Sequence, residues 1–225
     1  MATAPAAGIS DAVQDYAKAI YSLHGRLEQA VPTSAIADRL GVSAASTSAM
    51  VKRLETLGLV RREPYHGVEL TPAGERVALE VIRHHRLLEL YLADALGMSW
   101  DRVHEEAEVL EHAISPELSE LIAAKLGNPT HDPHGDPIPT VGGEIEEGQT
   151  RALAELVEGE RGVFTRVSDS DPEMLRYLAA RGIERGATVE IAGREPFGGP
   201  LTVRVAGREH ALGDQLACAM RVETA

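Results

Sequence analysis

Two imidazoles and two carboxylates recur at helical spacing within residues 103–112. At about 100° per residue, His104, Glu108, Glu111 and His112 fall within an arc of about 100°, beside an apolar seam. Imidazole nitrogen and carboxylate oxygen are ligands of divalent transition-metal ions. The segment therefore predicts a metal site. By itself it leaves one alternative open, a solvated acidic helix face with two incidental histidines.

The acidic charge of the chain is concentrated around this segment. The formal net charge is −13 over 225 residues, and residues 76–149 contain 5 basic and 15 acidic residues. A negative field of this kind favours cation capture, and it leaves the nearly neutral residues 1–75 free to present a local basic surface. Cys218 is the only cysteine, and the chain has no apolar run of membrane-spanning length. We therefore expect a cytoplasmic protein with no membrane partner.

Residues 32–54 carry the pattern of a helix-turn-helix. A short helix ends at Gly41, and Ser43 is placed to cap a second helix that would enter the DNA major groove. A hairpin over residues 60–71, turning at Tyr65-His66-Gly67, would add a wing. A helical hairpin without a DNA role is the alternative. The predicted contacts with phosphates and base edges are Ser43, Ser46, Thr47, Ser48, Lys52 and Arg53.

The middle of the chain offers further ligand types. A long helix over residues 71–97 places His85 and Glu89 four residues apart on one face, either as a plain pair or as metal ligands. Its surplus of apolar residues predicts a homodimer interface. The proline-rich loop 131–139 presents Asp132 and His134, as ligands or as part of a surface connector.

The last third of the chain predicts a small β-structure. Short alternating strands are expected at 162–167, 188–192, 201–205 and 209–212, with a helix near 172–181. The whole chain is predicted to be α+β. Its expected parts are a winged helix-turn-helix DNA-binding domain at 1–75, an all-helical dimerisation and metal-binding domain at 76–140, a linker at 141–149 and a small β-barrel at 150–225.

Four motifs in this order resemble the diphtheria-toxin-repressor family of dimeric, metal-dependent transcriptional repressors. They are the winged helix, the Arg83–Glu89 segment, the Val103–His112 segment and the Pro133–Pro139 loop. The resemblance is close over about residues 10–140. Beyond that, the barrel resembles the FeoA-like, Src-homology-3-like domain of longer members. The resemblance implies operator DNA and a second copy of the chain as partners, and no organic substrate.

The resemblance also implies two metal sites. The positions that match the primary ligands are Asp15, Glu108, Glu111 and His112. Iron-sensing members have methionine and cysteine where this chain has Asp15 and Glu108, and oxygen in place of sulfur favours the harder Mn²⁺, with Fe²⁺ or another divalent ion possible. Lys18 stands where two-metal members have a glutamate, so that paired cluster is not carried over. The positions assigned to a second site are His85, Glu89, His104, Asp132, His134 and Asp171, with Asp169 as the fallback for Asp171.

These observations together predict a manganese-dependent repressor of metal-homeostasis genes, in which metal orders the dimer for operator binding. An iron-dependent repressor of the same family is the nearest alternative. A winged-helix regulator of a small organic ligand is a second. A metallohydrolase is the third, because His104-Glu105 begins like a zincin motif; Glu108 stands where that motif needs a histidine, so we expect no enzyme.

Overall fold

The computed structural model describes residues 9–27, 29–63, 67–146, 148–169 and 171–224, which form two compact units. The first unit contains the chain up to residue 85, with residues 110–120 and 139–144. The second contains residues 86–109, 121–138 and the chain from residue 145 onward. The chain thus passes between the units several times. Each unit is built from segments that are distant in sequence.

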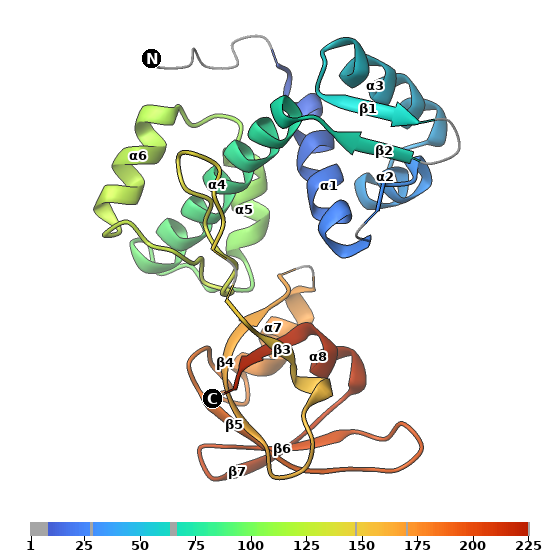
Figure 1. Ribbon diagram of the computed structural model, residues 1–225. Helices are drawn as coiled ribbons and strands as arrows, with labels where there is room; N and C mark the ends of the chain where they lie inside the picture. Colours follow the sequence, from blue (N-terminus) through green and yellow to red (C-terminus); the bar gives the residue numbers. More distant parts are fainter. Residues whose placement is uncertain (1–8, 28, 64–66, 147, 170, 225) are drawn as a thin grey trace. The chain divides into compact units, whose positions relative to one another are not determined.

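The first unit contains the predicted winged helix-turn-helix (Figure 1). Its elements in chain order are α1 (Asp11–Leu27), α2 (Thr33–Leu40), α3 (Ala44–Thr56), β1 (Val60–Glu63) and β2 (Gly67–Leu70). The hairpin is antiparallel, with Val60 opposite Leu70 and Glu63 opposite Gly67. The predicted wing turn at Tyr65 and His66 lies outside the described residues.

Local chemistry explains the turn between α2 and α3. Gly41 follows α2 with a φ of 64°, a left-handed conformation that glycine adopts at little cost. Ser43 is the N-cap of α3, and its hydroxyl accepts a hydrogen bond from the Ser46 amide at 3.1 Å. Ile20 on α1, Ile36 on α2 and several neighbours form a fully buried core that holds the three helices together. The helix-turn-helix that was predicted from the sequence is therefore observed, with its apolar residues in this core.

Three helices follow the hairpin. The long helix α4 (Pro72–Asp94) starts behind Thr71, whose hydroxyl accepts a hydrogen bond from the Gly74 amide at 3.2 Å. Helices α5 (Val103–Leu110) and α6 (Pro116–Lys125) come next. Among the described residues, no helix combines the length and apolar composition needed to cross a membrane.

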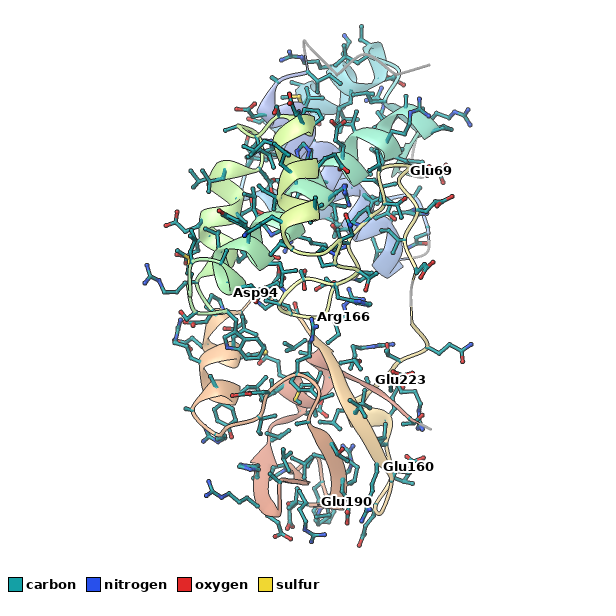
Figure 2. The ribbon with its side chains drawn as sticks, turned by 90° about the vertical axis from the view of Figure 1, so that its left-hand side faces the viewer. Glu69, Asp94, Glu160, Arg166, Glu190 and Glu223 are labelled. Carbon is teal, nitrogen blue, oxygen red and sulfur yellow. The ribbon has the colours of Figure 1, made fainter. Side chains whose placement is uncertain are left out.

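The second unit contains a six-stranded antiparallel sheet in the order β3-β8-β4-β5-β6-β7. Its long strands are β4 (Arg161–Val167), β5 (Thr188–Arg194), β6 (Leu201–Val205) and β7 (Arg208–Leu212), and α7 (Pro172–Ala179) interrupts them. Register shifts within the β4–β8 and β5–β6 pairs bend the sheet around a core that includes Phe164 and Ile191. Figure 2 shows Arg166 near one end of β4, with Glu160 and Glu190 at the opposite end of the sheet.

The end of the chain holds elements that the sequence pattern did not predict. These are β3 (Arg151–Ala152), a 3-10 turn (Leu153–Glu155), α8 (Asp214–Ala219) and β8 (Met220–Glu223). Each is too short for hydrophobic periodicity to identify. Tertiary pairing nevertheless places β8 at an interior position of the sheet, between β3 and β4.

The loop 131–138 is folded tightly within the second unit. One carboxylate oxygen of Asp132 accepts hydrogen bonds from the amides of His134 (2.8 Å) and Asp136 (2.9 Å). The carbonyl of His134 in turn accepts from the Val167 amide of β4 at 3.0 Å. Gly135, with a φ of 91°, lies against β4 so closely that a Cβ there would be 1.9 Å from the Thr165 carbonyl oxygen. The loop is thereby fixed to β4.

We predict that Gly135→Ala destabilises the protein by more than about 3 kcal/mol. The added Cβ would clash with the backbone of β4, and alanine adopts the positive φ of this position only with strain. Gly127 has a similar φ of 79° and open space around it, so Gly127→Ala should cost only about 1 kcal/mol. Urea unfolding of both variants measures the difference. Equal losses would mean that the loop moves away from β4 at little cost.

Candidate metal centres and DNA-binding surface

Three of the predicted primary ligands lie together in the first unit. Nε2 of His112 is 2.8 Å from Oδ1 of Asp15 and 3.5 Å from Oε1 of Glu111. One ligand atom from each of the three residues lies within 4.8 Å of the others. Asp15 comes from α1, and Glu111 and His112 come from the turn after α5. Two carboxylates and one imidazole form a donor set that suits Mn²⁺, Fe²⁺ or Zn²⁺.

Gln14 supports this group and was not predicted. Its side-chain carbonyl accepts a hydrogen bond from Nδ1 of His112 at 2.6 Å. Nδ1 is thereby engaged, and Nε2 is the nitrogen directed to Asp15. An outer partner of this kind fixes the ring orientation of a histidine ligand. No ligand motif marks Gln14 in the sequence, because its side chain is an amide and not one of the imidazole or carboxylate groups that bind these metal ions.

Glu111 is the most enclosed member of the group. Its side chain has no exposed surface, whereas the Asp15 side chain is 40% exposed. Lys18 of α1 donates to both Glu111 carboxylate oxygens, at 2.9 and 2.7 Å. Nδ1 of His85 is 2.5 Å from Oε2 of Glu111. His85, which was predicted for the second site, thus contacts a ligand of the first.

Glu108 is not a member of this three-residue group. It lies near the end of α5 in the second unit, where its Oε1 is 3.8 Å from Nε2 of His104, one turn earlier on the same helix. Glu108 thus contacts His104, and its side chain is partly exposed.

A second cluster of ligand types lies within the second unit. Glu89 of α4 meets Asp132 and His134 of the loop, with one ligand atom of each within 4.8 Å of the others, and all three side chains are buried. Nδ1 of His104 on α5 is 3.2 Å from Oε1 of Glu89 and 3.0 Å from Oδ2 of Asp169. Sequence position alone does not bring these residues together. The fold of the loop does.

Asp169, and not Asp171, is the acid that the barrel brings to this cluster. Asp171 is the N-cap of α7, and its carboxylate accepts a hydrogen bond from the Glu173 amide at 2.9 Å. The choice of Asp171 is thus corrected to the fallback, Asp169. The physical reason is that capping already engages Asp171.

A backbone contact engages one ring nitrogen of His134. Its Nε2 donates to the Trp100 carbonyl at 2.7 Å, and the two rings stack with centroids 6.0 Å apart. Nδ1 is buried and has no hydrogen-bond partner among the described residues. The nearby carboxylate oxygen, Oε2 of Glu89, is 3.8 Å away. Two ligands of one ion are commonly separated by about 3–4 Å, so this pair fits a shared cation.

Crowded acids and histidines shift several pKa values in this cluster. Hydrogen bonds to Asp169 and Glu89 raise the pKa of His104 to about 10. Burial opposes protonation of His134, yet the neighbouring Glu89 and Asp132 raise its pKa to about 9. Burial, with Asp136 and Glu89 nearby, raises the pKa of Asp132 to about 8. Without a metal, these groups therefore hold protons at neutral pH.

The predicted DNA-binding residues mostly share one exposed face of α3. Ser46, Ser48, Lys52 and Arg53 are exposed, as is the capping Ser43. Thr47 does not share this face, which corrects its prediction as a DNA contact: it is fully buried, and its hydroxyl donates to the Ser43 carbonyl at 3.1 Å. The helical turn directs it to the core. Arg61 and Arg62 of β1 are not among the predicted contacts, and their exposed side chains add positive charge to the wing.

The chain belongs to the iron-dependent repressor family. Models of this family match residues 9–68 (N-terminal DNA-binding domain) and 71–140 (metal binding and dimerisation domain), and a FeoA domain model matches residues 151–224. The described architecture agrees with a winged helix, a helical segment and an antiparallel β-domain in that order. The predicted family and fold class are therefore confirmed.

Individual relatives extend over almost the whole chain. The diphtheria toxin repressor of Corynebacterium glutamicum is 33% identical over 95% of this chain and 96% of its own length. The iron-dependent repressor IdeR of Mycobacterium tuberculosis is 33% identical over 95% and 97%. A solved structure described as a manganese-dependent transcriptional repressor in complex with manganese is 41% identical, covers 95% of this chain and 100% of that one, and has a TM-score of 0.88.

A cation that binds the second cluster should displace protons. Ligation needs neutral imidazole and ionised carboxylate, whereas His104, His134 and Asp132 hold protons at pH 7 because their pKa values are raised. We predict release of about two or more protons per ion at pH 7, and an affinity that rises with pH toward 10. Calorimetric Mn²⁺ titrations in buffers of different ionisation enthalpy measure this. Buffer-independent heats would contradict it.

Trp100 should report on the second cluster, because it is the only tryptophan and stacks on His134. We predict that Mn²⁺ or Co²⁺, which are paramagnetic, quenches Trp100 fluorescence saturably and that His134→Ala removes the quenching. His210→Ala, at a half-buried position on the edge strand β7, is the control. Quenching that persists unchanged in His134→Ala would place the bound ion elsewhere.

Proposed function

We propose that this chain is a manganese-dependent transcriptional repressor that binds operator DNA as a homodimer. The observation that carries the proposal is the meeting of Asp15 with Glu111 and His112. An acid on the first helix of the DNA-binding segment meets two ligands that follow α5. The donors are oxygen and nitrogen, without sulfur, and this set suits Mn²⁺.

The chain's own residues convert cation binding into an ordered DNA-binding segment. Asp15, Glu111 and His112 would hold a divalent cation, which would supply the positive charge that offsets the two carboxylates. Asp15 then holds α1 to the turn after α5, while Gln14 keeps the His112 ring in orientation. Because α1 shares a core with α2 and α3, fixing α1 restricts the position of α3. Only the arrangement in which the three ligands meet gains from the cation, so its population rises.

Exposed residues of α3 suit contact with DNA. Ser46 and Ser48 can hydrogen-bond phosphates or base edges, and Lys52 and Arg53 suit phosphates. Arg61 and Arg62 add basic groups on the wing. We leave Thr47 out of the contact set because it is buried. A local basic face on an acidic chain is sufficient, since Debye screening confines the effect of distant charges to about 8–10 Å.

The second cluster is proposed as a further metal site. Glu89, Asp132, His134, His104 and Asp169 supply its ligand types, and His134 Nδ1 is a buried nitrogen without a hydrogen-bond partner among the described residues. Occupancy would tie the loop 131–138 and the start of the β-domain to α4 and α5 within the second unit. A bound ion would thereby stabilise the second unit.

We propose the division expected from sequence for the functional parts: DNA binding by 1–75, dimerisation and metal binding by 76–140, a linker at 141–149 and a FeoA-like domain at 150–225. Leu118 and Leu121 are exposed on α6 three positions apart. Apolar residues at this spacing suit a homodimer contact. We place the protein in the cytoplasm, where its DNA partner is found.

An iron-dependent repressor is the second candidate for the metal. The matching family models and the mycobacterial relative carry iron in their descriptions. The two candidates differ in the ion that drives DNA binding. Operator binding titrated separately with Mn²⁺, anaerobic Fe²⁺, Co²⁺ and Zn²⁺ discriminates them.

We predict that Asp15→Ala lowers Mn²⁺-dependent operator affinity by about 100-fold or more. Loss of an outer partner of a ligand already costs about 10–100-fold in metal affinity, so loss of a ligand should cost at least as much. The measurement is fluorescence anisotropy with a duplex selected from random sequences by the Mn²⁺-loaded protein. Asp11→Ala, an exposed acid in the first turn of the same helix, is the matched control.

Two outcomes would overturn the proposal. Asp15→Ala could retain operator binding that still requires Mn²⁺, which would exclude Asp15 as a ligand. The unaltered protein could bind the selected duplex equally well with Mn²⁺ and with chelator, which would favour regulation by another kind of ligand.

A further inference from the structure

The positively charged ammonium group of Lys18 lies beside the first metal centre. Its ammonium nitrogen lies 2.9 and 2.7 Å from the two oxygens of Glu111 and 3.2 Å from Nδ1 of His85. The Lys18 side chain is 17% exposed and the Glu111 side chain is fully buried. The ion pair is therefore well shielded from water.

A buried carboxylate needs a neutralising partner. Removal of an ionised group from water costs several kcal/mol unless an opposite charge and hydrogen bonds compensate it. Lys18 satisfies both Glu111 oxygens at once. The atoms around the ammonium group, two carboxylate oxygens and one imidazole nitrogen, are also donor types that a divalent metal ion would accept.

Glu111 therefore faces two cation positions. One is defined by Asp15 and His112, and the other is filled by Lys18, which is three residues beyond Asp15 on α1. A cation at the first position and the ammonium group both draw on the charge of the same carboxylate. They also repel each other across a short, poorly hydrated distance.

We propose that Lys18 is an internal cation that lowers the affinity of the first centre for divalent metal and so sets the metal concentration at which the protein responds. In the metal-free protein Lys18 neutralises Glu111. In the metal-bound protein the ion shares that task. The inference rests on the proposed function, in which Asp15, Glu111 and His112 hold the regulatory ion.

Removal of the Lys18 charge should destabilise the metal-free protein more than the metal-bound protein, because in the metal-bound protein the ion still supplies positive charge beside Glu111. By thermodynamic linkage, the same substitution must tighten metal binding. A tightening of about tenfold or more is expected, within the usual range of coupling between two sites.

The test compares full-length variants in a Glu89→Gln background, which removes a buried carboxylate of the second cluster. Lys18→Met keeps an unbranched apolar side chain without the charge, and Lys18→Arg keeps the charge. Lys125→Met, at the exposed end of α6, is the matched control. Mn²⁺ affinity is measured by titration, and Tm is measured in chelator and in saturating Mn²⁺.

We expect Lys18→Met to bind Mn²⁺ about tenfold more tightly and to lose more Tm in chelator than in Mn²⁺. Lys18→Arg and Lys125→Met should behave like the parent. Equal or weaker Mn²⁺ affinity in Lys18→Met, or equal Tm losses in both conditions, would overturn the proposal. Lys18→Gln gives the same comparison if the methionine variant does not fold.

Failure of the proposed function has a different signature. In that case the parent itself would show no saturable Mn²⁺ binding that Asp15→Ala removes. If the parent binds Mn²⁺ through Asp15 and Lys18→Met does not differ from it, only the assignment of Lys18 is wrong.

Discussion

The burial of one carboxylate, Glu111, is the constraint on which the first unit depends. An ionised group without exposed surface must be neutralised where it lies. Lys18 supplies that charge from α1, and His112 and Asp15 complete the surroundings. The helix that carries Lys18 and Asp15 also packs against α2 and α3. The electrostatics of one buried acid is therefore connected to the position of the helices that would meet DNA.

The second unit depends on backbone geometry. The loop 131–138 turns around the Asp132 carboxylate and packs Gly135 against β4 without space for a side chain. This places Asp132 and His134 beside Glu89 in a buried cluster. Burial and the neighbouring acids raise the pKa of Asp132, whereas Glu89 and Asp132 raise the pKa of His134 against the opposing effect of burial. Protons thus occupy, in the metal-free state, groups that a cation would require in deprotonated form. Metal affinity and pH are coupled for that reason.

Local signals were sufficient for much of the fold. A left-handed glycine, a serine cap and apolar spacing located the helix-turn-helix, and alternation located four strands of the β-domain. The same signals failed for Thr47, because a hydroxyl group suits DNA contact whereas this position of the helix faces the core. They also failed for β8, a strand of four residues whose pairing with β3 and β4 is set by tertiary structure.

The sequence by itself determined the family, the order of the parts and the chemical types of the ligands, because these follow from motifs and from periodicity within single elements. Only the tertiary structure decided which further residues lie against those ligands. It placed Asp169 at His104 while Asp171 caps a helix, and it brought Lys18 to Glu111, 93 positions away. Spacing along a helix is fixed by local geometry. Contacts between distant segments depend on how buried surfaces pack and on which charges can be neutralised together.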